Sequence, residues 1–274
     1  MHVFIVYALS YHLPTSRYFP FFFMQLPTQF QQEKLLYFNR GQEAISVYEN
    51  AYYRWMNFSG ILQSLMLKSR PWQLTLPHHS VLLLPLLFHR PSQIIELGLG
   101  GGNLLRFLKK TIPELRLTSI EYNQQVIDCF LRYFNPLYQT NTIIHADIHR
   151  WFDQTRTNAD SWIIYDIYQP PKVPGNNGNT LIQLLAKTLT PKTCFSINLP
   201  EPSAPELTLL LEQLKAWLPS HRVYYFTVAR YRNVVIQLLP ALWDTKDPAF
   251  TTGSYVPPKL IPAWLKCWQA GKAL

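Results

Sequence analysis

Hydrophobic positions in residues 93–240 follow two spacings that alternate along the chain. Short apolar runs, which are typical of buried strands, occupy 93–98, 115–122, 141–147, 161–168 and 193–199. Helical spacing marks 103–111, 126–134, 181–189 and 206–218. This alternation predicts an α/β fold, with a mostly parallel sheet covered by helices on both faces. Two closing strands, 222–230 and 233–240, have no helix between them and predict an antiparallel edge strand.

The region before residue 77 has a different pattern. Residues 34–58 are rich in Tyr, Val and Ile and contain turn candidates at 39–41 and 49–50, so they predict two or three antiparallel strands. Residues 79–89 are apolar enough for a buried helix, which Pro85 should kink. We therefore expect a small N-terminal antiparallel β domain at 32–76 and a Rossmann-like domain at 77–274.

We expect residues 1–31 to be a leader before the two domains, and the pattern leaves its nature open. Two short apolar runs, 3–9 and 19–24, flank Arg17, and there is no clean cleavage site. No run approaches the roughly 18 apolar residues of a membrane span, so we expect no stable span. The alternatives are a signal or anchor, a disordered extension, or an over-extended start with Met24 as the natural first residue.

Composition narrows the class of protein. The chain has 274 residues, a net charge of +9 and only 15% charged residues, so the positive balance reflects scarce acids. It has no block of like charges, and we expect no nucleic-acid partner.

The three cysteines, Cys129, Cys194 and Cys267, are too far apart for a zinc motif. They favour a reduced, cytoplasmic protein.

Glycine is concentrated at one place. Four of the ten glycines lie between 98 and 102, where a predicted strand ends and a helix begins. Glycine there permits a tight turn and close approach of the backbone to a ligand. A dinucleotide fingerprint would need glycine at Asn103. Glu96, Gly98, Gly100 and Gly102 instead give the ExGxGxG pattern of S-adenosylmethionine-type sites.

Acidic residues end the next three predicted strands. Glu121, Asp147 and Asp166 fall where open α/β sheets bind ligands. Glu121 could accept both ribose hydroxyls of an adenosyl group, and Asp147 could reach the adenine amino group. Either acid alone would suit a helix N-cap or a solvated position. Together with the glycine turn, they predict an adenosyl-ligand site.

The sequence resembles the polyamine aminopropyltransferase (spermidine synthase) family from about residue 35 to 239. The resemblance includes segment 58–64, the glycine turn and residues 231–234. It implies a homodimer that transfers an aminopropyl group from decarboxylated S-adenosylmethionine to a small amine such as putrescine. It further implies that Gln63 contacts the donor tail, that Tyr231 lines the amine pocket and that Asp166 is the catalytic base.

Three positions depart from the family pattern. The acid of the family's GGGDGG loop is replaced by Gly101, and the second acid of its DSxDP motif by Gln169. The Tyr-His-Glu element reads Pro-His-His and ends at His79. Gln169 and His79 remain candidates for substrate binding, but neither restores the missing negative charge of a diamine pocket.

These departures keep two rival functions open. One is a methyltransferase that uses intact S-adenosylmethionine, whose carboxylate suits a glycine turn without an acid at a helix N-terminus. The other is a catalytically degenerate protein that retains the adenosyl-ligand pocket.

No metal is expected. His78 and His79 are adjacent, but the sequence places no third ligand near them at a metal-binding spacing.

The pattern also predicts the positions or roles of three further features. Arg106 on the helix at 103–111 is expected on a solvated face. Segment 169–180 could be a lid over the acceptor. Trp264 and Trp268 are expected in packing or at an interface.

Overall fold

The computed structural model describes residues 33–40, 44–137, 142–154, 160–167, 185, 188–245 and 256–274. The chain divides into two units, 1–33 and 34–274, and the elements below belong to the second. Gln169, segment 169–180 and the whole leader lie outside the described residues. Among the described helices, none is both long and apolar enough to cross a membrane.

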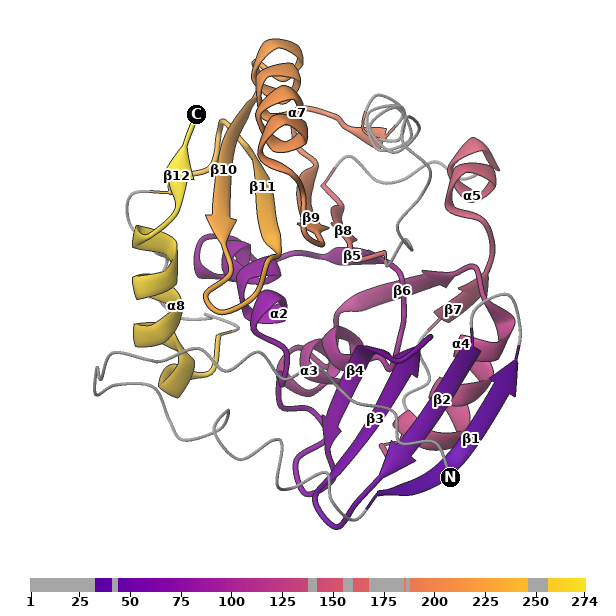
Figure 1. The fold of residues 1–274 in the computed structure, drawn as a ribbon. Helices are drawn as coiled ribbons and strands as arrows, with labels where there is room; N and C mark the ends of the chain where they lie inside the picture. The colour runs from indigo at the N-terminus through magenta and orange to yellow at the C-terminus, as the bar shows by residue number, and fades with distance from the viewer. Residues whose placement is uncertain are drawn as a thin grey trace. The chain divides into compact units, whose positions relative to one another are not determined.

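A four-stranded antiparallel sheet comes first in the chain (Figure 1). Its strands, in both sequence and spatial order, are β1 (Lys34–Arg40), β2 (Ala44–Glu49), β3 (Tyr53–Phe58) and β4 (Ile61–Leu67). Residues 34–58, predicted to form two or three strands, form three, and β4 lies beyond the predicted region. The first half of β4 is exposed and the second half is buried, so it lacks a clear period-2 pattern.

The second sheet has eight strands within the described residues, in the order β12-β10-β11-β9-β8-β5-β6-β7. The strands β5 to β9 are parallel to their neighbours in this series, as predicted. The five parallel strands are β5 (Gln93–Leu97), β6 (Arg116–Glu121), β7 (Thr142–His145), β8 (Trp162–Tyr165) and β9 (Cys194–Leu199).

Antiparallel pairing begins after β9. The closing strands β10 (His221–Thr227) and β11 (Val234–Pro240) pair antiparallel, and β11 also pairs antiparallel with β9. The chain therefore inserts β11 between β9 and β10. The antiparallel edge on this side is the short strand β12 (Lys272–Ala273).

Helices and helical turns connect the strands (Figure 1). They are α2 (Pro77–Leu82), η1 (Leu84–Leu87), α3 (Asn103–Thr111), α4 (Gln124–Cys129), η2 (Phe130–Phe134), α5 (Ile148–Gln154), α7 (Ala204–Trp217), η3 (Pro258–Leu260) and α8 (Ile261–Gln269). Pro85 lies in η1, so the predicted kink is a break between α2 and a 3-10 turn. α5 and α8 were not predicted. The predicted helix at 181–189 falls mostly outside the described residues.

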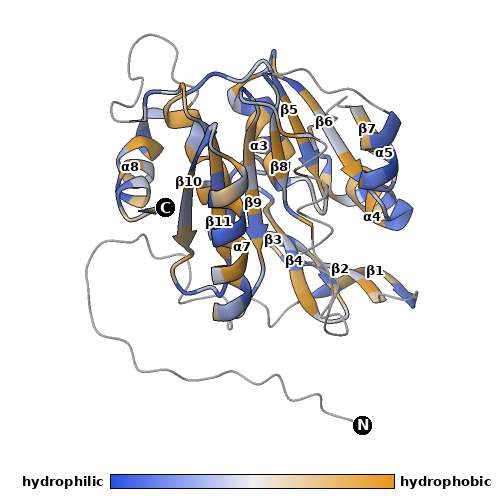
Figure 2. Ribbon diagram, turned by 90° about the horizontal axis from the view of Figure 1, so that it is seen from above, coloured by the Kyte–Doolittle hydropathy of each residue, from blue (hydrophilic) through white to orange (hydrophobic). Residues whose placement is uncertain are grey.

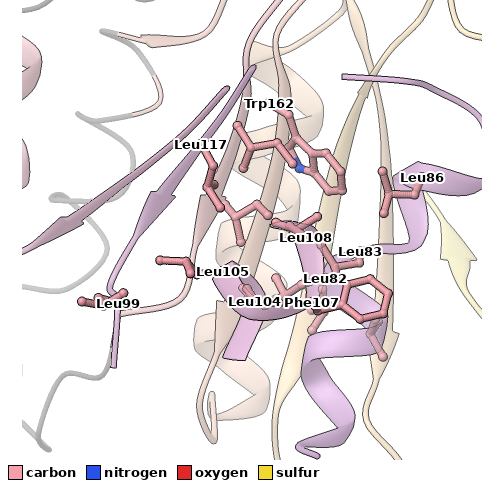
Figure 3. Packing of buried hydrophobic residues seen from close by; sticks show 14 of the residues in the cluster. Leu82, Leu83, Leu86, Leu99, Leu104, Leu105, Phe107, Leu108, Leu117 and Trp162 are labelled. Atoms are coloured by element: carbon pink, nitrogen blue, oxygen red, sulfur yellow. The ribbon is translucent and has the colours of Figure 1, made fainter. Parts of the chain in front are cut away.

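Side chains that alternate along the central strands build two hydrophobic clusters. Ile94 and Ile164 belong to one cluster, whereas their neighbours Ile95 and Ile163 belong to the other. Figure 2 shows hydrophobic residues along these strands and hydrophilic residues on α5. Figure 3 shows α2, α3 and β8 contributing Leu82, Phe107, Leu108 and Trp162 to the first cluster. Trp264 also packs there, as expected.

Candidate functional site

Three glycines with positive φ make the turn between β5 and α3. The φ angles are 93° at Gly98, 51° at Gly100 and 66° at Gly102, a region that side-chain-bearing residues rarely adopt. A Cβ atom at Gly98 would lie 2.4 Å from the backbone oxygen of Asp166. A Cβ at Gly102 would lie 2.3 Å from the ring of Phe130. Glycine is therefore required both by the turn and by its neighbours.

Gly101 has no room for the acid that the resemblance places there. A Cβ at Gly101 would lie 2.3 Å from the Oγ atom of Ser64, which accepts the Gly101 N–H at 3.1 Å. A Cβ at Gly100 would meet no atom within 4 Å. Of these two positions, only Gly100 faces open space. The loss of an acid at 101 thus accompanies a hydrogen bond between the glycine turn and β4.

A buried arginine, Arg106, donates hydrogen bonds to the backbone of the glycine turn and of two other segments. Arg106 is fully buried and donates to the backbone oxygen of Gly101, to those of Pro71 at 2.6 Å and Phe134 at 2.8 Å, and to Oδ1 of Asn103 at 2.7 Å. Burial lowers the pKa of Arg106 to about 9. The expectation of a solvated Arg106 is wrong, because these acceptors come from several segments that folding brings together.

Glu121 lies against the glycine turn, as its position at the end of β6 predicted. Its Oε2 accepts the Leu99 N–H at 3.1 Å, and its Oε1 accepts the Asn123 N–H at 2.9 Å. Burial raises the pKa of Glu121, although these amides oppose the shift. The carboxylate is therefore fixed next to the turn. Its contact with a ribose remains a prediction.

Asp147 follows β7 and begins α5. Its Oδ1 accepts the N–H groups of His149 and Arg150, both at 3.0 Å. This is the N-cap role weighed for the residue from sequence. The adenine contact stays a prediction, and only Oδ2 is free of these two capping bonds.

Glu96 is buried in the sheet two residues before the turn. It is 1% exposed, and its Oε2 accepts the Ser119 hydroxyl at 2.5 Å, which links β5 to β6. Burial raises the pKa of Glu96 to about 8. These observations give Glu96 a structural role beside the turn, and its contact with a donor stays a prediction.

Asp166 follows β8 and is held on several sides. Its N–H donates to the Leu97 oxygen at 2.9 Å. Its Oδ1 accepts the Asn198 amide at 2.8 Å, and Asn198 in turn accepts the Asn233 amide at 2.9 Å. Its Oδ2 lies 3.4 Å from Nε2 of His79 and 3.8 Å from Nε2 of His78.

The surroundings of Asp166 and His79 change the protonation of both groups. Burial would raise the pKa of Asp166, but the charge and hydrogen bonding of His78, followed by those of His79, hold it well below its ordinary value. Burial and then the charge of His78 lower the pKa of His79 to about 4, although Asp166 opposes the shift. Asp166 is therefore ionised and His79 neutral at pH 7.

The other predicted residues are placed with fewer contacts. Gln63 falls at a β-bulge in β4, between the pairs Met56–Ser64 and Asn57–Leu62. Bulges redirect side chains locally. Tyr231 lies half-buried in the loop between β10 and β11, where burial raises its pKa.

Sequence reasoning missed the residues that hold the others in place. Ser64 and Asn233 lie in segments that resemble the family but were given no role, and Asn198 lies in none of those segments. Each of the three contacts a partner distant in sequence. The adjacent histidines were visible in the sequence, but Asp166, which joins them, lies far along the chain. The signal available in the sequence was that Asp166 follows a predicted strand, while His78 and His79 lie near the start of a predicted helix.

Comparison with known sequences gives partial matches. No protein-family model matches the chain. Polyamine aminopropyltransferases from two strains of Neisseria meningitidis, serogroups A and B, are each 31% identical to it over 106 residues. The alignment covers 37% of this chain and 40% of each relative. The chain thus matches about two fifths of the length of these relatives.

Solved structures match far more of the chain. A spermidine synthase from Thermotoga maritima has a TM-score of 0.58 and 17% identity over 85% of this chain and 88% of its own. A probable spermidine synthase from Corynebacterium glutamicum has a TM-score of 0.57 and 14% identity over 75% of this chain and 79% of its own. Human methyltransferase-like protein 13 in complex with SAH has a TM-score of 0.52 and 17% identity over 72% of this chain and 92% of its own.

These matches define the class of fold. The chain has a spermidine synthase-like fold, in which an antiparallel sheet precedes a methyltransferase-like Rossmann sheet. The resemblance seen in the sequence is confirmed at the level of fold.

Proposed function

We propose that the protein is an adenosyl-donor-dependent transferase that moves an aminopropyl group to a small amine. One observation carries the proposal: acidic residues from two parallel strands meet the same glycine turn. Glu121 accepts the Leu99 N–H at 3.1 Å, and Gly98 packs against the backbone of Asp166. Ligands of open α/β sheets bind at this end of the strands.

The proposed contacts with the adenosyl donor use Glu121 and Asp147, whose carboxylates are held by backbone N–H groups. Glu121 would accept the ribose hydroxyls, Asp147 would accept the adenine amino group through Oδ2, and Gln63 would contact the tail. The amides of the glycine turn allow close approach of the donor. A charge-assisted hydrogen bond contributes about 1.5–3 kcal/mol, so Glu121 alone would dominate the affinity for the ribose.

The acceptor side is centred on Asp166, with Tyr231, Gln169 and His79 proposed to line the amine pocket. The amine lone pair would attack the carbon bonded to the sulfonium of decarboxylated S-adenosylmethionine. A C–N bond forms, the C–S bond breaks, and its electron pair stays on sulfur to give a thioether. The amine proton would leave to Asp166, which is ionised at neutral pH. Positioning of the two reactants would supply much of the rate.

A second candidate is methyl transfer from intact S-adenosylmethionine. The observation that favours it is the lack of space at Gly101, where Ser64 excludes a side chain. A helix N-terminus carries about half a positive charge, which suits the carboxylate of the intact donor. The tail of decarboxylated S-adenosylmethionine is cationic and has no carboxylate, so the positive helix N-terminus does not favour its binding.

Calorimetry separates these proposals. Decarboxylated S-adenosylmethionine, intact S-adenosylmethionine and methylthioadenosine would each be titrated into the protein. Tighter binding of the decarboxylated donor supports aminopropyl transfer, and tighter binding of the intact donor supports methyl transfer. No binding of any of the three would overturn the adenosyl site.

A mass-spectrometric assay with putrescine tests the role of Asp166. Asp166→Asn should lower the rate at least about 100-fold if the residue is the general base. Asp128→Asn on α4 is the matched control, because Asp128 is exposed and bonded only locally, to Gln124. Equal rates in the Asp166 variant and the wild type would remove Asp166 from the chemistry.

Two further expectations belong to this proposal. We propose a homodimer, which light scattering after size-exclusion chromatography would test, and a cytoplasmic location, which fractionation of the native cells would test.

A further inference from the structure

Three side chains near the end of β8 present metal-ligating atoms to one another. Nε2 of His79 lies 3.4 Å from Oδ2 of Asp166, and Nε2 of His78 lies 3.8 Å from the same oxygen. One ligand atom from each of the three residues lies within 4.8 Å of those of the other two. Imidazole and carboxylate groups are the donors that Zn²⁺ takes in catalytic sites.

The separations suit a tetrahedral ion. Zinc binds histidine nitrogen and carboxylate oxygen at about 2.0–2.2 Å, which places neighbouring ligand atoms about 3.4 Å apart. The separations of the two Nε2 atoms from Oδ2 of Asp166, 3.4 and 3.8 Å, are at or somewhat above this value, and the ligand atoms of the two histidines lie within 4.8 Å of each other.

The ligands come from fixed parts of the fold. His78 and His79 lie on α2, which the Gln237 amide of β11 anchors by donating to the backbone oxygens of Val81 and Leu82 at 2.8 and 3.2 Å. Asp166 is held through its other oxygen by Asn198, which is bonded to Asn233. Supporting bonds of this kind orient metal ligands and tune their affinity.

The histidines are also buried without full hydrogen bonding. Their side chains are 12% and 6% exposed, and the Nδ1 atom of each has no hydrogen-bond partner among the residues that the structure describes. Unpaired buried polar atoms destabilise a fold by about 1–3 kcal/mol each. These Nδ1 atoms are not the atoms that face Asp166, so the case for a ligand rests on the arrangement of the two Nε2 atoms and Oδ2 of Asp166.

We propose that His78, His79 and Asp166 bind a divalent transition metal ion, with Zn²⁺ as the species that fits best. Three protein ligands leave one coordination position for water or for an atom of the acceptor. The metal site does not depend on the proposed function. With Oδ1 of Asp166 bonded to Asn198 and Oδ2 bound to the ion, Asp166 would not at the same time accept the amine proton, so its roles as metal ligand and as base are alternatives.

Direct binding measurements test the site. Protein stripped with EDTA and dialysed would be titrated with Zn²⁺ by calorimetry, and with Co²⁺ by visible absorption, which reports tetrahedral coordination. We expect one ion per chain. His78→Asn, His79→Asn and Asp166→Asn should each weaken binding by at least about 10- to 100-fold.

Controls separate this cluster from other sites and from misfolding. His149→Asn, outside the cluster, should bind zinc as the wild type does, and circular dichroism would verify that each variant is folded. An excess of Mg²⁺ should not compete. The proposal is overturned if folded wild-type protein binds no zinc, or if the three cluster variants bind it as tightly as His149→Asn. Donor titration of the same samples shows separately whether the adenosyl site is intact.

Discussion

Glu96 makes the stability of the protein depend on pH in a direction that can be calculated. Its reference pKa is 4.5, and burial raises the pKa in the fold to about 8. Between these two values the folded protein holds a proton that the unfolded chain has released. Stability must therefore fall as the pH rises from about 4.5 to 8 and then level off.

The magnitude follows from the same two values. Each pKa unit corresponds to about 1.4 kcal/mol, so Glu96 costs about 3 kcal/mol of folding free energy at pH 7. Glu96→Gln removes this titration while keeping an oxygen that can accept the Ser119 hydroxyl, now 2.5 Å from Oε2. Relative to the wild type, the variant should gain about 3–4 kcal/mol between pH 5 and pH 8.

Urea unfolding at pH 5, 6, 7 and 8 measures this change. Comparing the variant with the wild type at each pH cancels any constant packing effect of the amide. Glu212→Gln on the exposed face of α7 is the matched control and should show no pH-dependent gain. A difference between Glu96→Gln and the wild type that does not vary with pH would refute the reasoning.

Three other substitutions test the residues around the glycine turn. Arg106→Met leaves buried carbonyl groups unpaired and should lower the free energy of unfolding by about 3–5 kcal/mol in urea titrations. Gly101→Ala should lower it by about 1–3 kcal/mol through the clash with Ser64, and Ser64→Gly in the same chain should restore part of the loss. Glu121→Gln should weaken adenosyl-ligand binding at least about tenfold by calorimetry, and unchanged affinity would contradict its assignment to the ribose.

Element type was predictable where the hydrophobic spacing was strong. The central strands are buried on both faces, so they appear in the sequence as short apolar runs. The apolar residues of the helices between them recur at helical spacing. α5 was missed because its seven residues are too short for a helical period to appear, and its start is set by the Asp147 cap. β12, of two residues, forms only through its pairing with β10.

The sequence predicted which carboxylates and glycines lie at the candidate site, but not the residues that hold them in place. Glu121 and Asp166 follow strands, so their meeting at the glycine turn follows from the parallel order. Arg106 was wrongly expected on the surface, since helical spacing cannot show that carbonyl groups from Pro71 and Phe134 converge on its guanidinium. The missing acid at Gly101 was visible in the sequence, but the contact between Gly101 and Ser64 that accompanies it was not.

The sequence by itself determined the α/β class, the place of the glycine turn and the acids beside it, because these depend on local spacing and strand order. Only the tertiary structure decided the protonation of Glu96, the burial of Arg106 and the joining of His78 and His79 to Asp166. Those properties depend on distances between segments remote in sequence and on the loss of water around charged groups.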